Sequence, residues 1–199
     1  MLINDKKSCR DFYGNVRKTL TVQERTEWDR RILSFLVNSE LYRRSDLLLT
    51  YVSVGSEAGT RELISFALAD GKRVAVPVCI GQRMSFFEIE SVNNLKKGAF
   101  GIPTADKSAK PVQTYDMSAL CIVPALSFDR NMNRLGMGGG FYDRFFAEND
   151  LLSIGICYER CFSCRLPAEP HDMKVKYVLT ENGFKNAENS YFKEVSTYG

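Results

Sequence analysis

The segment RLGMGGGFYDRF, residues 134–145, concentrates residue types that bind phosphate. Four of its glycines fall within five positions, between Arg134 and Asp143. Successive glycine N–H groups form a concave cradle for anions, a following helix adds its positive N-terminal end, and an aspartate can hold Mg²⁺ on a phosphate. The segment therefore predicts a triphosphate site. For the glycines alone, a tight turn with a close helix–sheet contact is the alternative.

The common nucleotide motifs do not fit this segment. A Walker A loop needs a lysine after its last glycine, and none lies here. The dinucleotide fingerprint and the kinase loop both need a third glycine at position 141, where the chain has Phe141. The predicted phosphate site is thus of another kind.

The spacing Cys157-x3-Cys161-x2-Cys164 offers a rival chemistry, because radical S-adenosylmethionine enzymes hold an iron–sulfur cluster with it. Cys157 falls within a predicted strand, and only 35 residues follow Cys164. Three thiols without a fourth ligand also make a poor structural zinc site. The cluster is disfavoured but stays an alternative. Histidine clusters are excluded, since His171 is the only histidine.

The composition sets the broad class. The chain has 199 residues, with 27 basic and 24 acidic ones, a balance that argues against a nucleic-acid partner. It lacks an apolar run of about 18–20 residues and an apolar segment near its charged start, so we expect neither a membrane span nor a secretion signal. Six cysteines are expected to be free thiols. We expect a cytoplasmic protein.

The hydrophobic pattern predicts three helices in the first part of the chain. Asp5 opens the first, which ends near residue 20, and Thr21 opens the second with capping-box spacing to Glu24. Thr60 caps the third, which ends at Gly71. The expected buried faces are Trp28, Ile32, Phe35 and Leu36 in the second helix, and Leu63, Ile64, Ala67 and Leu68 in the third.

Apolar runs typical of buried strands separate the helices. Strands are expected at 47–54, 73–78, 119–124, 153–159 and 175–181, a short strand or hairpin arm at 84–90, and a surface loop at 93–103. A helix follows the glycines to about residue 149. A strand, a helix and a strand within about 30 residues form a parallel βαβ unit. We predict an α/β fold, a three-layer sandwich around a mostly parallel sheet, Rossmann-like without the dinucleotide fingerprint. It is expected to be one domain over residues 1–199, with a polar tail at 182–199.

Five segments, in order, resemble the 5-formyltetrahydrofolate cyclo-ligase family, also called methenyltetrahydrofolate synthetases. They are KKSCR (6–10), TYVSVGSE (50–57), GKRVAVP (71–77) with FGIP (100–103), the glycine segment preceded by IVPALSFDRNMN (122–133), and HDMKVKYVLTE (171–181). The chain departs from the family's usual residues at Gly139, Phe141, Thr104–Ala105 and Cys161.

The resemblance implies that ATP and 5-formyltetrahydrofolate give 5,10-methenyltetrahydrofolate, ADP and phosphate, with Mg²⁺ as cofactor. Arg134 would be the catalytic cation, and the Mg²⁺ ligands would be Asp143 and Asp172. The implied ATP-binding residues are Lys6, Lys7, Ser8, Cys9, Arg10, Arg134, Leu135, Gly136, Met137, Gly138, Gly139, Gly140, Phe141 and Tyr142. The implied folate-binding residues are Tyr51, Val52, Glu57, Met137, Gly138, Gly139, Gly140 and Phe141.

The resemblance also implies a monomer and a folate substrate that can carry a polyglutamate tail. Outside the family context, Lys6 and Arg10 would be read as a solvated helix face, Glu57 as an exposed loop carboxylate and Asp172 as a turn cap. A nucleotide-binding regulatory module without catalysis is a further alternative.

Overall fold

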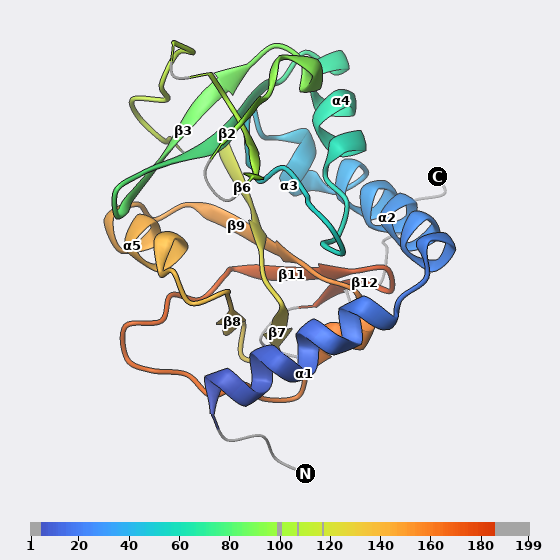
Figure 1. The fold of residues 1–199 in the computed structure, drawn as a ribbon. Coiled ribbons are helices and arrows are strands. Elements are labelled where there is room, and N and C mark those ends of the chain that lie inside the picture. Colours follow the sequence, from blue (N-terminus) through green and yellow to red (C-terminus); the bar gives the residue numbers. More distant parts are fainter. Residues whose placement is uncertain (1–4, 99–100, 107, 117, 186–199) are drawn as a thin grey trace.

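A computed structural model describes residues 5–98, 101–106, 108–116 and 118–185 (Figure 1). A seven-stranded sheet runs through it, in the order β12-β11-β9-β6-β1-β2-β3. β1, β2, β6, β9 and β11 pair in parallel, and the edge strands β3 and β12 are antiparallel. The strands are β1 (Leu47–Thr50), β2 (Arg73–Ile80), β3 (Arg83–Ile89), β6 (Ala119–Pro124), β9 (Leu152–Ile156), β11 (Tyr177–Thr180) and β12 (Gly183–Lys185).

Helices cover both faces of this sheet. They are α1 (Lys6–Thr19), α2 (Val22–Val37), α3 (Glu40–Arg43), α4 (Arg61–Ala69) and α5 (Phe141–Glu148). One hydrophobic core joins α2, α3 and α4 to one sheet face, and a second joins α5 to the other. Alternation along a strand divides neighbours between the cores: Leu48 faces the first, and Leu47 and Leu49 face the second. The predicted α/β three-layer sandwich is confirmed.

The chain order of the strands creates a switch point between β1 and β6. From β1 the chain moves through α4 to β2 on one side, and from β6 through α5 to β9 on the other. Because the two crossovers cover opposite faces, their loops diverge at the carboxyl ends of β1 and β6. Such a crevice is where doubly wound sheets bind ligands. Helix α1 crosses the molecule beside β7 and β8 (Figure 1).

All three predicted helix starts are confirmed, but the third lacks the expected side-chain cap. Asp5 accepts a hydrogen bond from the Ser8 N–H, and Thr21 forms the full capping box with Glu24. Thr60 precedes α4, but its side chain makes no capping hydrogen bond. Its hydroxyl instead donates to the Tyr51 carbonyl, at 2.7 Å. Thr60 therefore stands at the predicted N-cap position, but its hydroxyl is used within the loop that follows β1.

That loop also explains why the predicted strand 47–54 is too long. β1 ends at Thr50, because the following residues turn back in hydrogen bonds between residues 51–54 and 57–60. β9 (Leu152–Ile156) is also shorter than predicted, because it ends at Ile156 and not at residue 159. β11 covers only Tyr177–Thr180 of the predicted 175–181.

Two further expectations on packing were wrong. Phe35 of α2 is 37% exposed and does not belong to either core. Its ring lies at the sheet edge, 4.0 Å from where a Cβ at Gly183 would stand. The polar tail expected at 182–199 is the second error, because its residues Gly183–Lys185 form strand β12 at the edge of the sheet. Residues 186–199 lie outside the described part of the chain.

Several short elements had no clear sequence signal. β7 (Ser127–Asp129), β8 (Arg134–Leu135) and β10 (Phe162–Ser163) form a small second sheet, and β4 (Lys96–Lys97) pairs with β5 (Pro103–Thr104) inside the expected surface loop. Single 3₁₀ turns occupy Val92–Asn94 and Glu159–Cys161. Among the described residues, no helix is both long and apolar enough to cross a membrane.

Candidate active site

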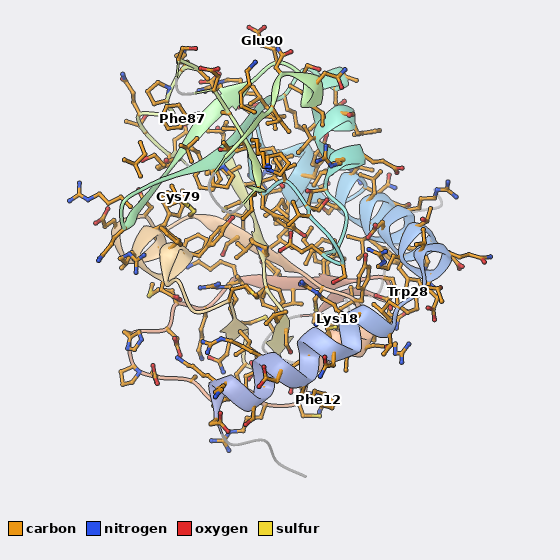
Figure 2. The ribbon with its side chains drawn as sticks, in the orientation of Figure 1. Phe12, Lys18, Trp28, Cys79, Phe87 and Glu90 are labelled. Atoms are coloured by element: carbon orange, nitrogen blue, oxygen red, sulfur yellow. The ribbon has the colours of Figure 1, made fainter. Side chains whose placement is uncertain are left out.

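A cleft of about 1300 Å³ lies at the switch point of the sheet. Its walls include the loop after β1, the segment from the end of β6 to the start of α5, helix α1, and residues 169–172. β2 also contributes, including Cys79, which is labelled in Figure 2. Single small-molecule pockets have volumes of about 300–1,000 Å³. The cleft therefore has room for more than one ligand.

The glycine run forms one wall, in a backbone conformation that favours glycine. Gly138 and Gly140 have φ angles of 98° and 64°, in a region that other L-residues rarely adopt. Gly140 is the last residue before α5, so the run stands in front of the helix N-terminus. Arg10 of α1 donates from Nε to the Gly136 carbonyl at 2.9 Å. This contact joins α1 to the run.

Arg134 and Asp143 form an ion pair in the wall of the cleft. Their Nη2–Oδ2 distance is 2.9 Å, and their side chains are only 6% and 20% exposed. The other Asp143 oxygen accepts from the Met173 N–H at 3.1 Å, which places this carboxylate against the segment that contains Asp172. Arg134 Nε is buried without a hydrogen-bond partner among the described residues.

A second ion pair joins Lys6 to the 169–172 segment. Lys6 Nζ lies 2.8 Å from Asp172 and 2.9 Å from Glu169. Burial acts to raise the pKa of Asp172, but the Lys6 ammonium and the Glu169 N–H outweigh it and hold that pKa below its ordinary value. Burial likewise acts to lower the pKa of Lys6, and the two carboxylates raise it overall. Both groups are thus charged at neutral pH.

The opposite end of the cleft holds Glu57 in a tightly bonded loop. The Glu57 carboxylate accepts from the Val54 N–H at 3.0 Å and is half-buried. Burial raises its pKa, against the lowering effects of that N–H and of Arg17. Tyr51 donates to the Ala58 carbonyl at 2.7 Å and closes the base of the loop. Tyr51 and Val52 are buried and line the cleft.

Glu169, His171 and Asp172 place one ligand atom each within 4.8 Å of one another, the only such group among the described residues. Carboxylate oxygens suit Mg²⁺, which often binds through one or two carboxylates plus substrate phosphates. Asp143 and Asp172 both line the cleft and each is paired with a cation, but Asp143 is not part of this group of three.

The structure brings most of the predicted residues to the cleft and leaves three aside. Lys7 and Ser8 are exposed on α1, and Cys9 is buried against Leu126, Leu135 and Leu166. None of the three is among the residues lining the cleft, whereas Lys6 and Arg10 are. Arg17 of α1 also lines the cleft, although it lies outside every segment that the sequence indicated.

The three cysteines of the rival motif do not form a metal-binding group in the described part of the chain. Cys157 and Cys161 are buried and Cys164 is exposed. Burial raises the pKa of Cys157 well above its ordinary value and that of Cys161 to about 11, so both remain protonated thiols at neutral pH. This geometry argues against the iron–sulfur reading.

The fold and the cleft define an α/β protein with a large ligand site at the carboxyl edge of a mostly parallel sheet. A family model described as the 5-formyltetrahydrofolate cyclo-ligase family matches residues 2–181. The chain belongs to that family. The expected family and the expectation of an enzyme are confirmed.

Individual relatives agree with this assignment. A 5-formyltetrahydrofolate cyclo-ligase of Mycolicibacterium smegmatis is 33% identical over 137 residues, 65% of this chain and 71% of the relative. One of Haemophilus influenzae is 25% identical over 87% of this chain and 96% of its own length. The solved structure of Aquifex aeolicus 5,10-methenyltetrahydrofolate synthetase superposes with a TM-score of 0.82 at 25% identity, covering 97% and 98% of the two chains.

Proposed function

We propose that this protein converts 5-formyltetrahydrofolate to 5,10-methenyltetrahydrofolate, with cleavage of ATP to ADP and phosphate and with Mg²⁺ as cofactor. The observation that carries the proposal is the cleft of about 1300 Å³ with chemically different ends. One end has paired cations and carboxylates beside a glycine wall, and the other has the half-buried Glu57 beside the buried Tyr51 and Val52. This division suits a triphosphate and a folate bound side by side.

The proposed reaction has two stages. The formyl oxygen attacks the γ-phosphorus and ADP leaves. The neighbouring N10 then attacks the activated formyl carbon, loses its proton, and closes the ring as phosphate departs. Phosphoryl transfer depends mainly on positioning and on neutralising charge, so no protein nucleophile is required.

The phosphate end has the residues for that task. Lys6, Arg10 and Arg134 would offset the phosphate charge, and the glycine N–H groups would donate to phosphate oxygens. Asp143 and Asp172 would hold Mg²⁺, which neutralises charge on the phosphates when bound. Phe141 and Tyr142 would form apolar walls.

The two ion pairs imply an exchange of partners on binding. In the free protein Arg134 is paired with Asp143, and Lys6 with Asp172. When the phosphates take the cations and Mg²⁺ takes the carboxylates, every charge still has a partner. ATP alone would leave the carboxylates unpaired, and the metal alone would leave the cations unpaired; an uncompensated buried charge is strongly unfavourable. We therefore expect ATP and Mg²⁺ to bind cooperatively.

Glu57 would accept hydrogen bonds from pterin N–H groups at the folate end. Its carboxylate is fixed by the Val54 N–H, so it is presented in one orientation. Tyr51 and Val52 would pack against the ring system. The monomeric state and the cytoplasmic location stay predictions, the first to be checked by sedimentation.

The test is a direct assay. Purified protein is mixed with 5-formyltetrahydrofolate and Mg-ATP, and the near-ultraviolet absorbance of the methenyl product is followed. We expect product only when protein, ATP and Mg²⁺ are all present, with one ADP released per product. ATP binding without folate-dependent turnover would overturn the proposal and favour the regulatory module.

A further inference from the structure

Asp29 of α2 contacts the Glu57 loop from outside the cleft. Its Oδ1 accepts from the Gly59 N–H at 2.8 Å and from the Tyr158 hydroxyl at 2.9 Å. The Tyr158 hydroxyl also lies 3.3 Å from the Glu57 carbonyl. One carboxylate oxygen of Asp29 thus binds both the loop after β1 and Tyr158, which follows β9. Asp29 itself does not line the cleft.

The packing around Asp29 leaves it little freedom. Trp28, the preceding residue, is labelled in Figure 2, and its ring centroid lies 5.5 Å from that of Tyr158. A Cβ at Gly59 would clash with the Asp29 carboxylate, so the loop backbone comes as close as glycine allows. Hydrogen bonds to a charged acceptor are stronger than those between neutral groups. The contact is therefore a strong constraint on the loop.

From this geometry we infer that Asp29 is a positioning residue for folate binding, acting through the loop that carries Glu57. The inference rests on the proposed function for the identity of the ligand at Glu57. Arg25, one turn earlier on α2, supports the same loop by donating to the Gly55 carbonyl at 2.7 Å. α2 thus holds the loop on both sides of Glu57, at Gly55 and at Gly59, and Glu57 itself lines the cleft.

The role differs from that of the residues at the phosphate end. Asp29 makes no contact with the glycine run, Lys6 or Arg134 among its hydrogen bonds, so its loss should leave ATP binding intact. Loosening the loop should instead weaken the hold on the folate. A purely structural role would lower stability without separating the two substrates.

The experiment is a double-mutant cycle of Asp29→Ala and Glu57→Gln. Dissociation constants for 5-formyltetrahydrofolate are measured by titration calorimetry, and KM values for both substrates are measured alongside. Asp29→Ala should raise the folate Kd about tenfold, equivalent to about 1.4 kcal/mol, and leave the Mg-ATP KM within about twofold. In the Glu57→Gln background the same change should have less than about a twofold effect, because the residue it acts through is already altered.

Asp29→Asn supplies rescue, since an amide keeps an oxygen acceptor of the same shape; its folate Kd should fall between wild type and Asp29→Ala. Glu27→Ala, an exposed change on the same helix, is the matched control and should match wild type. Independent effects of Asp29 and Glu57, or equal losses for both substrates, would overturn the inference. Wild-type protein that binds the folate but does not turn it over would count against the proposed function alone. The double-mutant cycle would still test the role of Asp29, because it is measured through the folate Kd. Absence of folate binding in the wild type would overturn both.

Discussion

The two ends of the cleft are built in different ways. At the phosphate end, Lys6 and Arg134 each hold a carboxylate, Asp172 and Asp143, and the adjacent backbone contains positive φ angles at Gly138 and Gly140. At the folate end, the loop is fixed by hydrogen bonds from hydroxyl, amide and carboxylate groups, with Glu57 as the half-buried acid. If ATP and the folate bind as proposed, the end with the ion pairs would exchange charged partners, whereas the loop of Glu57 is held by its own hydrogen bonds.

The difference shows how each end should respond to change. Exchange of ion pairs makes the phosphate end sensitive to the loss of a charge, because the former partner is then left alone. The folate end should be sensitive to the geometry of its loop. Substitutions that separate ATP effects from folate effects therefore test whether the two ends are independent.

The largest expected effect follows Arg134→Ala. Turnover should fall at least about 100-fold, as for the loss of a group that stabilises transition-state charge. Stopped-flow or steady-state assays of methenyl product give kcat, and titration calorimetry gives the folate Kd, which should stay within about twofold. Arg130→Ala, exposed and nearby in sequence, is the control. A lowered folate affinity with unchanged turnover would assign Arg134 to the other end.

Alanine in the glycine run should weaken ATP binding at least tenfold, about 1.4 kcal/mol. At Gly140 the φ of 64° adds strain, and the new Cβ would lie 2.7 Å from Arg144. At Gly139, where φ is not positive, it would lie 3.0 Å from the Phe141 ring, so this variant tests approach to the phosphates with less strain. The measurement is the rise in melting temperature on adding Mg-ATP.

Gly14→Ala is the matched control for those variants, because Gly14 lies within α1 and a Cβ there meets nothing within 4 Å. It should gain up to about 1 kcal/mol from helix propensity and keep the full ATP shift. A full ATP shift in Gly139→Ala would contradict the phosphate cradle.

Glu57→Gln should raise the folate KM at least about tenfold, equivalent to about 1.4 kcal/mol, and leave the Mg-ATP KM unchanged. The amide keeps an acceptor for the Val54 N–H but loses the charge that pterin N–H groups would meet. Steady-state kinetics with each substrate varied in turn checks this, with Glu62→Gln on the exposed side of α4 as control. A raised KM for Mg-ATP would show that the two ends are coupled.

The same variant should change the pH dependence of stability. Burial raises the pKa of Glu57 above its ordinary value of 4.5, so the folded protein holds this proton more tightly than the unfolded chain does. The stability that this proton contributes is fully present below the Glu57 pKa of the unfolded chain. It is lost as pH rises through the Glu57 pKa of the folded protein. Glu57→Gln should therefore melt above wild type at neutral pH, with the gap closing below pH 4.5. A gap that widens toward acid would refute the assignment.

The smallest effect is expected from the cysteines. Replacing Cys157, Cys161 and Cys164 together with alanine should retain kcat and both KM values, with a loss of stability from the two buried members. Cys164→Ser alone should be neutral, since that side chain is exposed. Iron in the wild type and not in the triple variant, or an inactive but folded variant, would restore the cluster hypothesis.

The sequence by itself determined the features that depend on neighbours along the chain. Capping at Asp5 and Thr21, the buried strand 119–124 and the glycine run before α5 are local patterns, and the structure contains each of them. Periodicity and the order of strands and helices were enough for the α/β class. The family followed from motifs whose order along the chain is itself sequence information.

Only the tertiary structure decided which polar groups meet. Nothing near Asp29 indicates that it bonds to Gly59, thirty residues away, or that Tyr158 shares the same oxygen, because those contacts exist only once α2, β1 and β9 are packed. Thr60 shows the same limit: it stands at the N-cap position, but its hydroxyl oxygen accepts from the Ser53 N–H and donates to the Tyr51 carbonyl, so it makes no capping hydrogen bond. Partner choice among polar side chains depends on distances across the fold, and these are fixed by the packing of the two cores.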